Sequence, residues 1–204
     1  MFVAFEGGDG AGKTTQIEAL TLWMRERGHV PLVTREPGGT TLGLAIRRLL
    51  LHGEDVSPRA EALLFAADRA HHVDTVVRPA LAAGRVVLTD RYLDSSIAYQ
   101  GAGRTMAGEE VLALSLWATQ GLLPHLTVLL DVPPMVGQAR RRDRPDRVEA
   151  EPGEFHTRVR EHYLRLATAE PDRYLVLDAG LPVGELAAAV AARVEPMLWA
   201  AVAR

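Results

Sequence analysis

Residues 7–15, which read GGDGAGKTT, combine small residues, one lysine and two hydroxyl groups in a pattern that can bind phosphate. Glycines let the backbone turn sharply, so that several N–H groups face inward and donate hydrogen bonds to phosphate oxygens. A helix that begins at the end of this stretch adds the positive end of its dipole. Lys13 can reach the outer phosphates of a nucleotide, and the hydroxyl group of Thr14 can coordinate Mg²⁺. The stretch therefore predicts a phosphate-binding loop.

The spacing of Gly7, Gly12, Lys13 and Thr14 matches the P-loop pattern of proteins that bind nucleoside triphosphates. The pattern follows an apolar run and opens a helical one, which is the context that its mechanism requires. Lys13 is the only lysine among the 23 Lys and Arg residues of the chain. Lysine carries a compact charge on a thin stem, whereas the guanidinium fork of arginine is broad. We interpret the exception as a requirement of a narrow loop.

Two carboxylates end apolar runs, Asp90 after VVLT and Asp131 after LTVLL. A carboxylate at the carboxyl end of a strand lies near Mg²⁺ in P-loop proteins, and the sequence does not rank the two. Arg91 follows Asp90 directly and is expected at the same edge of the sheet, where ligands bind. A structural ion pair between Asp90 and Arg91 is the alternative interpretation.

Residues 140–154 are highly charged, contain two prolines and lack apolar periodicity, so we expect an exposed excursion between two helices. A solvated charged loop is one interpretation. Beside a P-loop we favour a mobile lid, because a migrating phosphoryl group must be shielded from water and its charge neutralised. The excursion carries five arginines, namely Arg140, Arg141, Arg142, Arg144 and Arg147.

Five apolar runs rich in Val and Leu show little alternation, at 2–6, 30–35, 85–90, 126–131 and 174–178. Such runs are typical of parallel strands that are buried on both faces. The pattern predicts helices at 14–27, 41–51, 57–84, 108–120, 134–142, 154–169 and 183–203. Pro79 is expected to kink or divide the long one, which Ser57 and Pro58 begin as N-cap and first helical residue. The alternation of strand and helix predicts an α/β doubly wound fold.

The length of 204 residues fits a single domain, 1–204, with the lid at about 140–153. The chain has no cysteine, which excludes disulfides and thiolate metal sites. Its net charge of −3 argues against nucleic acid or an acidic membrane as partner.

Residues 186–203 are the most apolar helical segment, but charged residues and a proline interrupt it. We therefore expect no membrane span, and the N-terminus does not read as a signal peptide, so a cytoplasmic location is expected.

Two classes of nucleotide-binding protein compete at this stage, a switch and a kinase. GTPases of the usual kind read guanine through an Asn-Lys-x-Asp motif, and this chain has neither an asparagine nor a second lysine. A partitioning ATPase has no need of an arginine-rich excursion. The pattern therefore favours a kinase that passes a phosphoryl group to a small acceptor, with a nucleotide switch and a deoxynucleoside kinase as the alternatives.

Five segments together resemble the motifs of bacterial thymidylate kinases, the dTMP kinase family: GGDGAGKTTQ (7–16), TREPGGT (34–40), LLFAADRAHH (63–72), DRYLDSSIAYQG (90–101) and DRVE (146–149). They occur in the order of the family and span nearly the whole chain. The resemblance implies a P-loop NTPase fold with a five-stranded parallel sheet flanked by helices. It also implies phosphorylation of dTMP to dTDP by ATP and Mg²⁺, in dTTP biosynthesis, by an enzyme that is usually a homodimer.

The resemblance also implies roles for individual residues. Phe65 stacks on the thymine ring, Arg69, Ser96 and Gln100 read the base edge, and Tyr99 crowds the 2′ position of the sugar. Arg47 and Arg91 hold the acceptor phosphate, and Asp9 reaches toward the 3′-hydroxyl. The implied dTMP site comprises Asp9, Glu36, Pro37, Arg47, Phe65, Arg69, Arg91, Ser96, Tyr99 and Gln100. From pattern alone, Phe65 is also readable as a core residue, and Arg69 as a surface arginine paired with Glu61 or Asp68.

The implied ATP site comprises Gly7, Gly8, Asp9, Gly10, Ala11, Gly12, Lys13, Thr14, Thr15 and Arg140, and the implied metal ligands are Thr14 and Asp90. The P-loop contains no arginine while the lid is basic, so the chain resembles the form of the family whose catalytic arginine comes from the lid. The implied catalytic residues are therefore Asp9, Lys13, Arg91, Arg142 and Arg144. Within the lid, Arg142 and Arg144 are expected to face phosphate, and Arg140 the adenine.

Overall fold

The computed structural model describes residues 1–104, 106–141 and 144–202. Within them, five parallel strands form one sheet in the order β2-β3-β1-β4-β5: β1 (Phe2–Glu6), β2 (Leu32–Arg35), β3 (Val87–Asp90), β4 (Leu126–Asp131) and β5 (Tyr174–Asp178). The three inner strands are almost wholly buried, whereas the two edge strands are partly exposed. The expected parallel sheet, covered on both faces, is confirmed.

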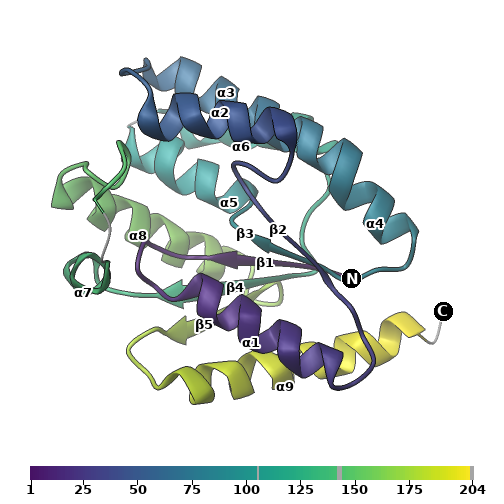
Figure 1. Ribbon diagram of the computed structural model, residues 1–204. Helices are drawn as coiled ribbons and strands as arrows, with labels where there is room; N and C mark the ends of the chain where they lie inside the picture. The colour runs from purple at the N-terminus through teal and green to yellow at the C-terminus, as the bar shows by residue number, and fades with distance from the viewer. Residues whose placement is uncertain (105, 142–143, 203–204) are drawn as a thin grey trace.

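Helices cover the two faces of the sheet unequally (Figure 1). On one face lie α1 (Lys13–Arg25) and α9 (Val183–Val202), packed against Val128 and Leu130 of β4. Leu129 points to the other face and packs near α8 (Gly153–Ala169). That side also carries most of the remaining helices, which are α2 (Thr41–His52), α3 (Pro58–His72), α4 (Arg78–Ala82), α5 (Leu93–Ser96) and α6 (Gly108–Thr119). The short α7 (Pro134–Arg140) follows the carboxyl end of β4.

The long helical stretch after Ser57 is interrupted before Pro79. Ser57 is the N-cap and Pro58 the first helical residue, as expected. The segment η1 (Val73–Val77) is π-helical and leads into α4, in which Pro79 is the second residue. A wider turn accommodates the proline, which lacks an N–H group and whose ring clashes with a carbonyl one turn earlier in a regular helix.

A second helical stretch lies within DRYLDSSIAYQG, outside the helices that the apolar pattern predicts. The short α5 continues into the π-helical segment η2 (Ile97–Gly103). This stretch packs against α8 and α6. It carries four residues of the sequence motif, and all four face one cavity, namely Ser95, Ser96, Tyr99 and Gln100.

The excursion between α7 and α8 is shorter and less exposed than expected. It was expected at 140–154, whereas α7 ends at Arg140 and α8 begins at Gly153, and Val148 between them is buried. The expectation of a wholly exposed excursion is wrong here, because Val148 joins the hydrophobic cluster that contains Leu51 and Phe155. Among the residues that the structure describes, none of the helices has the length and apolar character needed to cross a membrane.

Candidate active site

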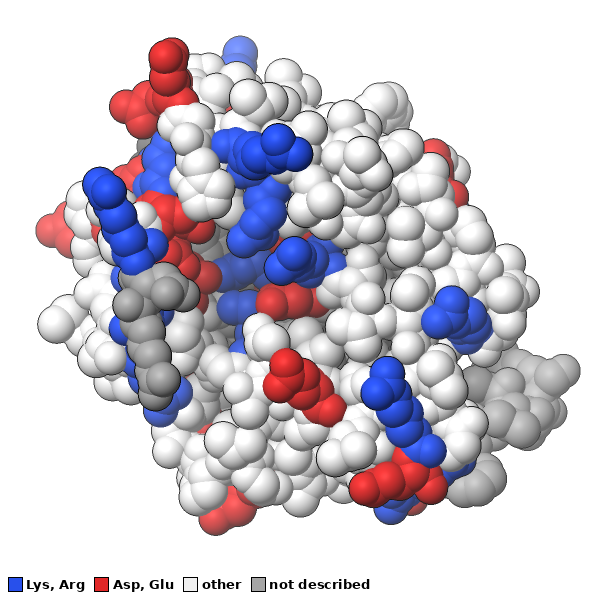
Figure 2. All heavy atoms as spheres, in the orientation of Figure 1, with Lys and Arg blue, Asp and Glu red and all other residues white. Residues whose placement is uncertain are grey.

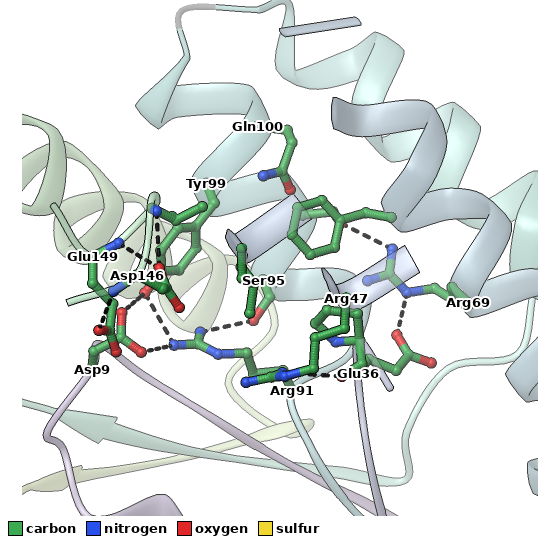
Figure 3. Close-up of a pocket in the computed structure, with 15 residues that line it drawn as sticks. Asp9, Glu36, Arg47, Arg69, Arg91, Ser95, Tyr99, Gln100, Asp146 and Glu149 are labelled. Atoms are coloured by element: carbon green, nitrogen blue, oxygen red, sulfur yellow. Dashed lines mark hydrogen bonds and ion pairs between the residues drawn. The ribbon is translucent and has the colours of Figure 1, made fainter. Parts of the chain in front are cut away.

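Two cavities adjoin at the carboxyl ends of the strands, where ligands bind in open parallel sheets. The first, the inner cavity, is small, with a volume of about 110 Å³. Figure 3 shows the side chains that surround it. Its lining consists of Asp9, Glu36, Pro37, Arg47, Leu51, Phe65, Arg69, Arg91, Ser95, Ser96, Tyr99, Gln100, Asp146, Val148 and Glu149.

The second, the loop cavity, is larger, at about 680 Å³. Residues 9–16 form one wall of it, and the apolar side chains of Leu181, Val183 and Leu186 lie in the lining as well. Polar groups from three other parts of the chain complete it, namely Arg35, Asp90, Arg140 and Arg141. A cavity with a phosphate-binding loop and an apolar patch can hold a molecule with one charged and one flat apolar end.

Five charged residues line both cavities and so mark the junction between them: Asp9, Glu36, Arg47, Arg91 and Glu149. In Figure 2, Lys and Arg side chains gather around a hollow with acidic side chains beside them. A group that passes from a ligand in one cavity to a ligand in the other crosses this junction. Its arginines can neutralise a transferring anion.

The P-loop joins β1 to α1 through backbone that favours glycine. Gly7 has a φ of +132°, and a Cβ atom there would overlap the carbonyl oxygen of Leu130 on β4. Lys13 is buried at the start of α1, and its Nζ donates hydrogen bonds to the carbonyl oxygens of Gly7 and Gly8, each at 3.1 Å. Burial and then the positive charge of Arg91 lower the pKa of Lys13. The ammonium group therefore lies inside the loop and can transfer its hydrogen bonds to phosphate.

Arg91 is the centre of the junction. It has a φ of +68°, in the left-handed region that non-glycine residues rarely adopt, and such residues often mark functional sites. Its Nη2 donates to Asp9 Oδ1 at 2.5 Å and to the Tyr99 hydroxyl at 3.2 Å, and its Nη1 donates to Ser95 Oγ at 3.2 Å. Burial acts to raise the pKa of Asp9, but the charges of Arg91 and Lys13 outweigh it and hold the pKa below its usual range. The ion pair of Arg91 is formed with Asp9, and not with Asp90 as the alternative interpretation had it.

Glu6 positions this arginine, and the sequence interpretation missed it. Its carboxylate is fully buried at the end of β1. It accepts hydrogen bonds from the backbone N–H groups of Tyr92 and Ser95 and from the hydroxyl groups of Ser95 and Tyr163. The segment after Arg91 is thus tied to β1. A glutamate at the end of a fully apolar strand was the available signal, because a buried carboxylate needs partners.

Arg69 lines the inner cavity and is buried, so its interpretation as a surface arginine is wrong. Its Nε donates to Glu36 Oε2 at 2.7 Å, and its other donors reach the Ser96 and Ser115 hydroxyls and the carbonyl of Tyr92. Neither Glu61 nor Asp68, the expected partners, is its ion-pair partner. Glu36 lies 33 residues away in the chain, so local spacing could not identify it.

The other expected contacts of the acceptor also line the inner cavity. Phe65 is half-buried, packs against a hydrophobic cluster and also lines the inner cavity. Arg47 is anchored by the Pro37 carbonyl, to which its Nη1 donates at 3.1 Å. The Tyr99 hydroxyl donates to Asp9 Oδ2 at 3.2 Å.

Asp90 and Asp131 differ in their surroundings. Asp131 forms two hydrogen bonds with Arg160, at 2.6 and 2.8 Å. Asp90 lines the loop cavity, and its buried Oδ1 atom has no hydrogen-bond partner within the described part of the chain. An unpartnered carboxylate oxygen beside Thr14 fits an oxygen-binding cation. Across the described residues, no cluster of three or more His, Asp or Glu side chains forms a complete metal site.

The arginines of the excursion divide into groups. Arg140 and Arg141 line the loop cavity, and Arg140 Nη1 donates to the carbonyl of Ala179 at 2.9 Å. Arg141 is a candidate that the expectations left out, and it forms an ion pair with Glu149 at 3.3 Å. Arg144 is exposed and does not belong to either lining, while Arg142 lies outside the described residues. Arg147 turns away from both cavities to the buried Glu61.

Comparison with known proteins gives one consistent result. The family model described as thymidylate kinase matches residues 5–190. The chain is 57% identical to the thymidylate kinase of Clavibacter sepedonicus over 204 residues, covering 98% of this chain and 97% of the relative. It is 58% identical to that of Leifsonia xyli subsp. xyli over 199 residues, covering 96% and 94%. It resembles the crystal structure of thymidylate kinase from Ehrlichia chaffeensis with a TM-score of 0.81 and 30% identity, over 96% of this chain and 98% of that one.

Proposed function

The chain belongs to the thymidylate kinase family and phosphorylates dTMP with ATP, and we propose how its residues divide this reaction. The junction between the inner and the loop cavity carries the proposal, because two nucleotides bound end to end would meet there. In this assignment ATP binds in the loop cavity and dTMP in the inner cavity. The whole chain, 1–204, acts as a single kinase domain.

The inner cavity suits a pyrimidine deoxynucleotide. The Phe65 ring offers an aromatic face to the base, and the deeply placed Arg69 offers hydrogen bonds to its edge. Tyr99 is held by Asp9 and Arg91 where it crowds the 2′ position of the sugar. Asp9 itself lies within reach of the 3′ side. These contacts support a deoxyribose and a base that offers an acceptor to Arg69.

The transfer needs positioning and charge neutralisation rather than a strong base. An oxygen of the dTMP phosphate attacks the γ-phosphorus of ATP, the bond from that phosphorus to the β–γ bridging oxygen breaks, and ADP leaves. The attacking phosphate is already an anion at neutral pH. Arg47 and Arg91 hold it at the junction, while Lys13 and the N-terminus of α1 hold the phosphates of ATP.

Mg²⁺ fits the loop cavity through two groups of this chain. The Thr14 hydroxyl and the unpartnered Asp90 carboxylate oxygen would hold it, with nucleotide phosphate oxygens and water as the remaining ligands. When bound, the ion supplies charge that stabilises the phosphates of ATP. The Arg160 partner of Asp131 makes that carboxylate the weaker candidate.

The excursion acts as a lid over the phosphates, at about 140–153. Arg140 lies beside Ala179 on the side where the apolar lining suits adenine. Arg141, Arg142 and Arg144 are the lid arginines that we assign to phosphate. Arg147 instead anchors the far end of the lid to the body of the protein.

A homodimer is the expected assembly, and small nucleotides rather than nucleic acid are the expected partners. Large apolar side chains are exposed on three adjacent helices, among them Leu42 and Leu49 on α2, Leu63 on α3 and Trp117 on α6. Figure 1 shows these helices side by side. An apolar surface of this kind supports a protein interface. We also propose that the enzyme acts in the cytoplasm, where its nucleotides are available.

A substrate panel tests the assignment. ADP release is measured with dTMP, dUMP, dCMP, dGMP and UMP as acceptors, and dTMP is expected to give the highest kcat/KM. Preferred turnover of another monophosphate contradicts the thymidylate assignment. Thymidine serves as the acceptor that identifies a deoxynucleoside kinase, and ATP binding without transfer to any acceptor identifies a switch.

A further inference from the structure

A buried carboxylate lies behind the inner cavity rather than in it. Glu61, in the first turn of α3, is fully buried. Its Oε1 accepts hydrogen bonds from Gln100 Nε2 at 3.0 Å and from Arg104 Nε at 3.2 Å. Its Oε2 accepts from Arg104 Nη2 at 3.1 Å and from Arg147 Nη2 at 2.6 Å. The two arginines hold the carboxylate in its charged form and lower the pKa of Glu61 against the effect of burial, which alone would raise it.

The charge on Glu61 decides which way Gln100 faces. A carboxylate accepts hydrogen bonds and donates none, so the amide nitrogen of Gln100 must point toward Glu61. The amide oxygen of the same side chain then points toward the inner cavity, as Figure 3 shows. Gln100 is buried and lines that cavity. It therefore presents an acceptor to the ligand.

Arg69 presents a donor to the same cavity. A guanidinium group has five N–H donors, and four of those of Arg69 are engaged by Glu36, Ser96, Ser115 and Tyr92, which leaves one on Nη2. One acceptor and one donor match the N3–H and O4 groups of thymine or uracil. Cytosine presents the reverse pattern, an acceptor at N3 and a donor at N4.

We propose that Glu61 is a positioning residue that gives the enzyme its selectivity for thymine over cytosine, by fixing the orientation of the Gln100 amide. The proposal rests on the assignment of the inner cavity to the base of dTMP. Glu61 touches no substrate atom in this arrangement and acts only through Gln100. Its bond to Arg147 also makes it an anchor of the lid, a purely structural role from which the test must separate the proposal.

The Glu61→Gln substitution inverts the orientation of Gln100. Two arginine donors face the Oε2 position, at 3.1 and 2.6 Å, and only one faces Oε1, at 3.2 Å. The new amide oxygen therefore takes the Oε2 position, and its NH₂ group faces Gln100. Gln100 then turns its oxygen toward residue 61 and its NH₂ group toward the cavity, where it opposes N3–H of thymine and accommodates N3 of cytosine. We expect the ratio of kcat/KM for dTMP to that for dCMP to fall about tenfold or more. A lid anchor alone would lower both values together and leave the ratio unchanged.

Glu151→Gln is the matched control. Glu151 is the other carboxylate paired with Arg104, but it makes no contact with Gln100 among the described residues. This variant should keep the dTMP to dCMP ratio of the wild type. A ratio that falls equally in both variants would assign the effect to loss of charge near Arg104 and overturn the proposal.

A second pair of variants covers the case in which Glu61→Gln does not fold, judged by thermal melting. Glu61→Gln combined with Arg104→Gln keeps the local charge balanced, and Arg104→Gln alone is its reference. The ratio should fall in the double variant relative to the single one, and an equal ratio overturns the proposal. Failure of the functional assignment is distinguishable, because wild-type protein would then show no preference for dTMP.

Discussion

Lys13 is the residue for which the loop leaves the least freedom. Its ammonium group is buried among carbonyl oxygens of Gly7 and Gly8. The broader fork of arginine does not fit between them in the same way, although it keeps the charge. We expect Lys13→Arg to lower kcat by about 100-fold in the ADP-release assay. The matched control is Arg25→Lys at the exposed end of the same helix, which should leave kcat unchanged. Near-normal turnover of Lys13→Arg would show that the loop needs only a positive charge.

The Asp68 carboxyl group lines neither cavity, and its titration makes the stability of the protein depend on pH. It is buried on α3, its Oδ1 accepts from the Gly38 N–H group at 3.3 Å, and its Oδ2 has no partner within the described residues. Burial, and then the charge of Glu36, raises the pKa of Asp68 from an ordinary 3.8 to about 6. The folded protein therefore keeps this proton longer than the unfolded chain does. The stabilisation is complete below about pH 4 and is lost as the pH rises through about 6.

The Asp68→Asn variant isolates that titration. An amide does not titrate, so the free energy of unfolding of the variant should rise relative to that of the wild type by about 2 kcal/mol between pH 4 and pH 6. Denaturant unfolding at several pH values measures the difference. A difference that stays constant over this range would mean that Asp68 titrates normally in the folded state.

The positions of candidate site residues were predictable from sequence where these residues lie close together in the chain. The P-loop residues and the motif from Asp90 to Gln100 needed no long-range information. Partners across the chain were not predictable, because the fold and not the spacing brings them together. Arg69 meets Glu36, Arg91 meets Asp9, and Glu61 meets Arg147, 86 positions away.

At the scale of elements, α7 supports the P-loop through close contact between their backbones. A Cβ atom at Gly137 would overlap the carbonyl oxygen of Asp9, and one at Gly10 would overlap the carbonyl oxygen of Gly137. The helix and the loop thus pack backbone against backbone. We expect Gly137→Ala to displace the loop, raise the KM for ATP about tenfold and destabilise the fold by about 1–3 kcal/mol. Gly137 lines neither cavity, so the effect would come from the support alone.

Gly108→Ala provides the comparison for that test. Gly108 begins α6, and a Cβ atom there meets no atom within 4 Å. The same added methyl group should therefore leave the KM for ATP unchanged and alter stability by less than about 1 kcal/mol. Equal effects of both substitutions on ATP binding would remove the supporting role of α7.

Elements were predictable where the apolar pattern is simple. All five strands and most helices lie within a few residues of their expected ranges. The π-helical segments η1 and η2 were not foreseen, because a widened turn depends on packing that periodicity does not record. In η2 this geometry turns Tyr99 and Gln100 toward the inner cavity. An element that the pattern did not predict is therefore one that lines the inner cavity.

At the scale of the whole molecule, the sheet brings together two cavities whose residues come from both ends of the chain. Residues 9–16 and Leu186 line the same loop cavity, and the inner cavity is closed by helices from the middle of the chain. The face formed by α2, α3 and α6 lies against the back of the inner cavity. A dimer through this face would therefore stiffen α3, the helix that carries both Phe65 and Arg69.

The dimer is tested on one exposed leucine of that face. Leu63 on α3 is 58% exposed, and Leu22 on α1 is 60% exposed on a different helix pair. A charge at Leu63 would have to be buried in the interface, which is costly, whereas a charge at Leu22 would remain in water. We therefore expect Leu63→Glu to convert the dimer to a monomer and Leu22→Glu to leave it intact, as measured by sedimentation equilibrium. A monomeric wild type contradicts the dimer itself, and a dimeric Leu63→Glu variant places the interface elsewhere. If dimer formation also stiffens α3, the monomeric Leu63→Glu variant should have a higher KM for dTMP than the Leu22→Glu variant has. The KM for ATP should be the same in both variants.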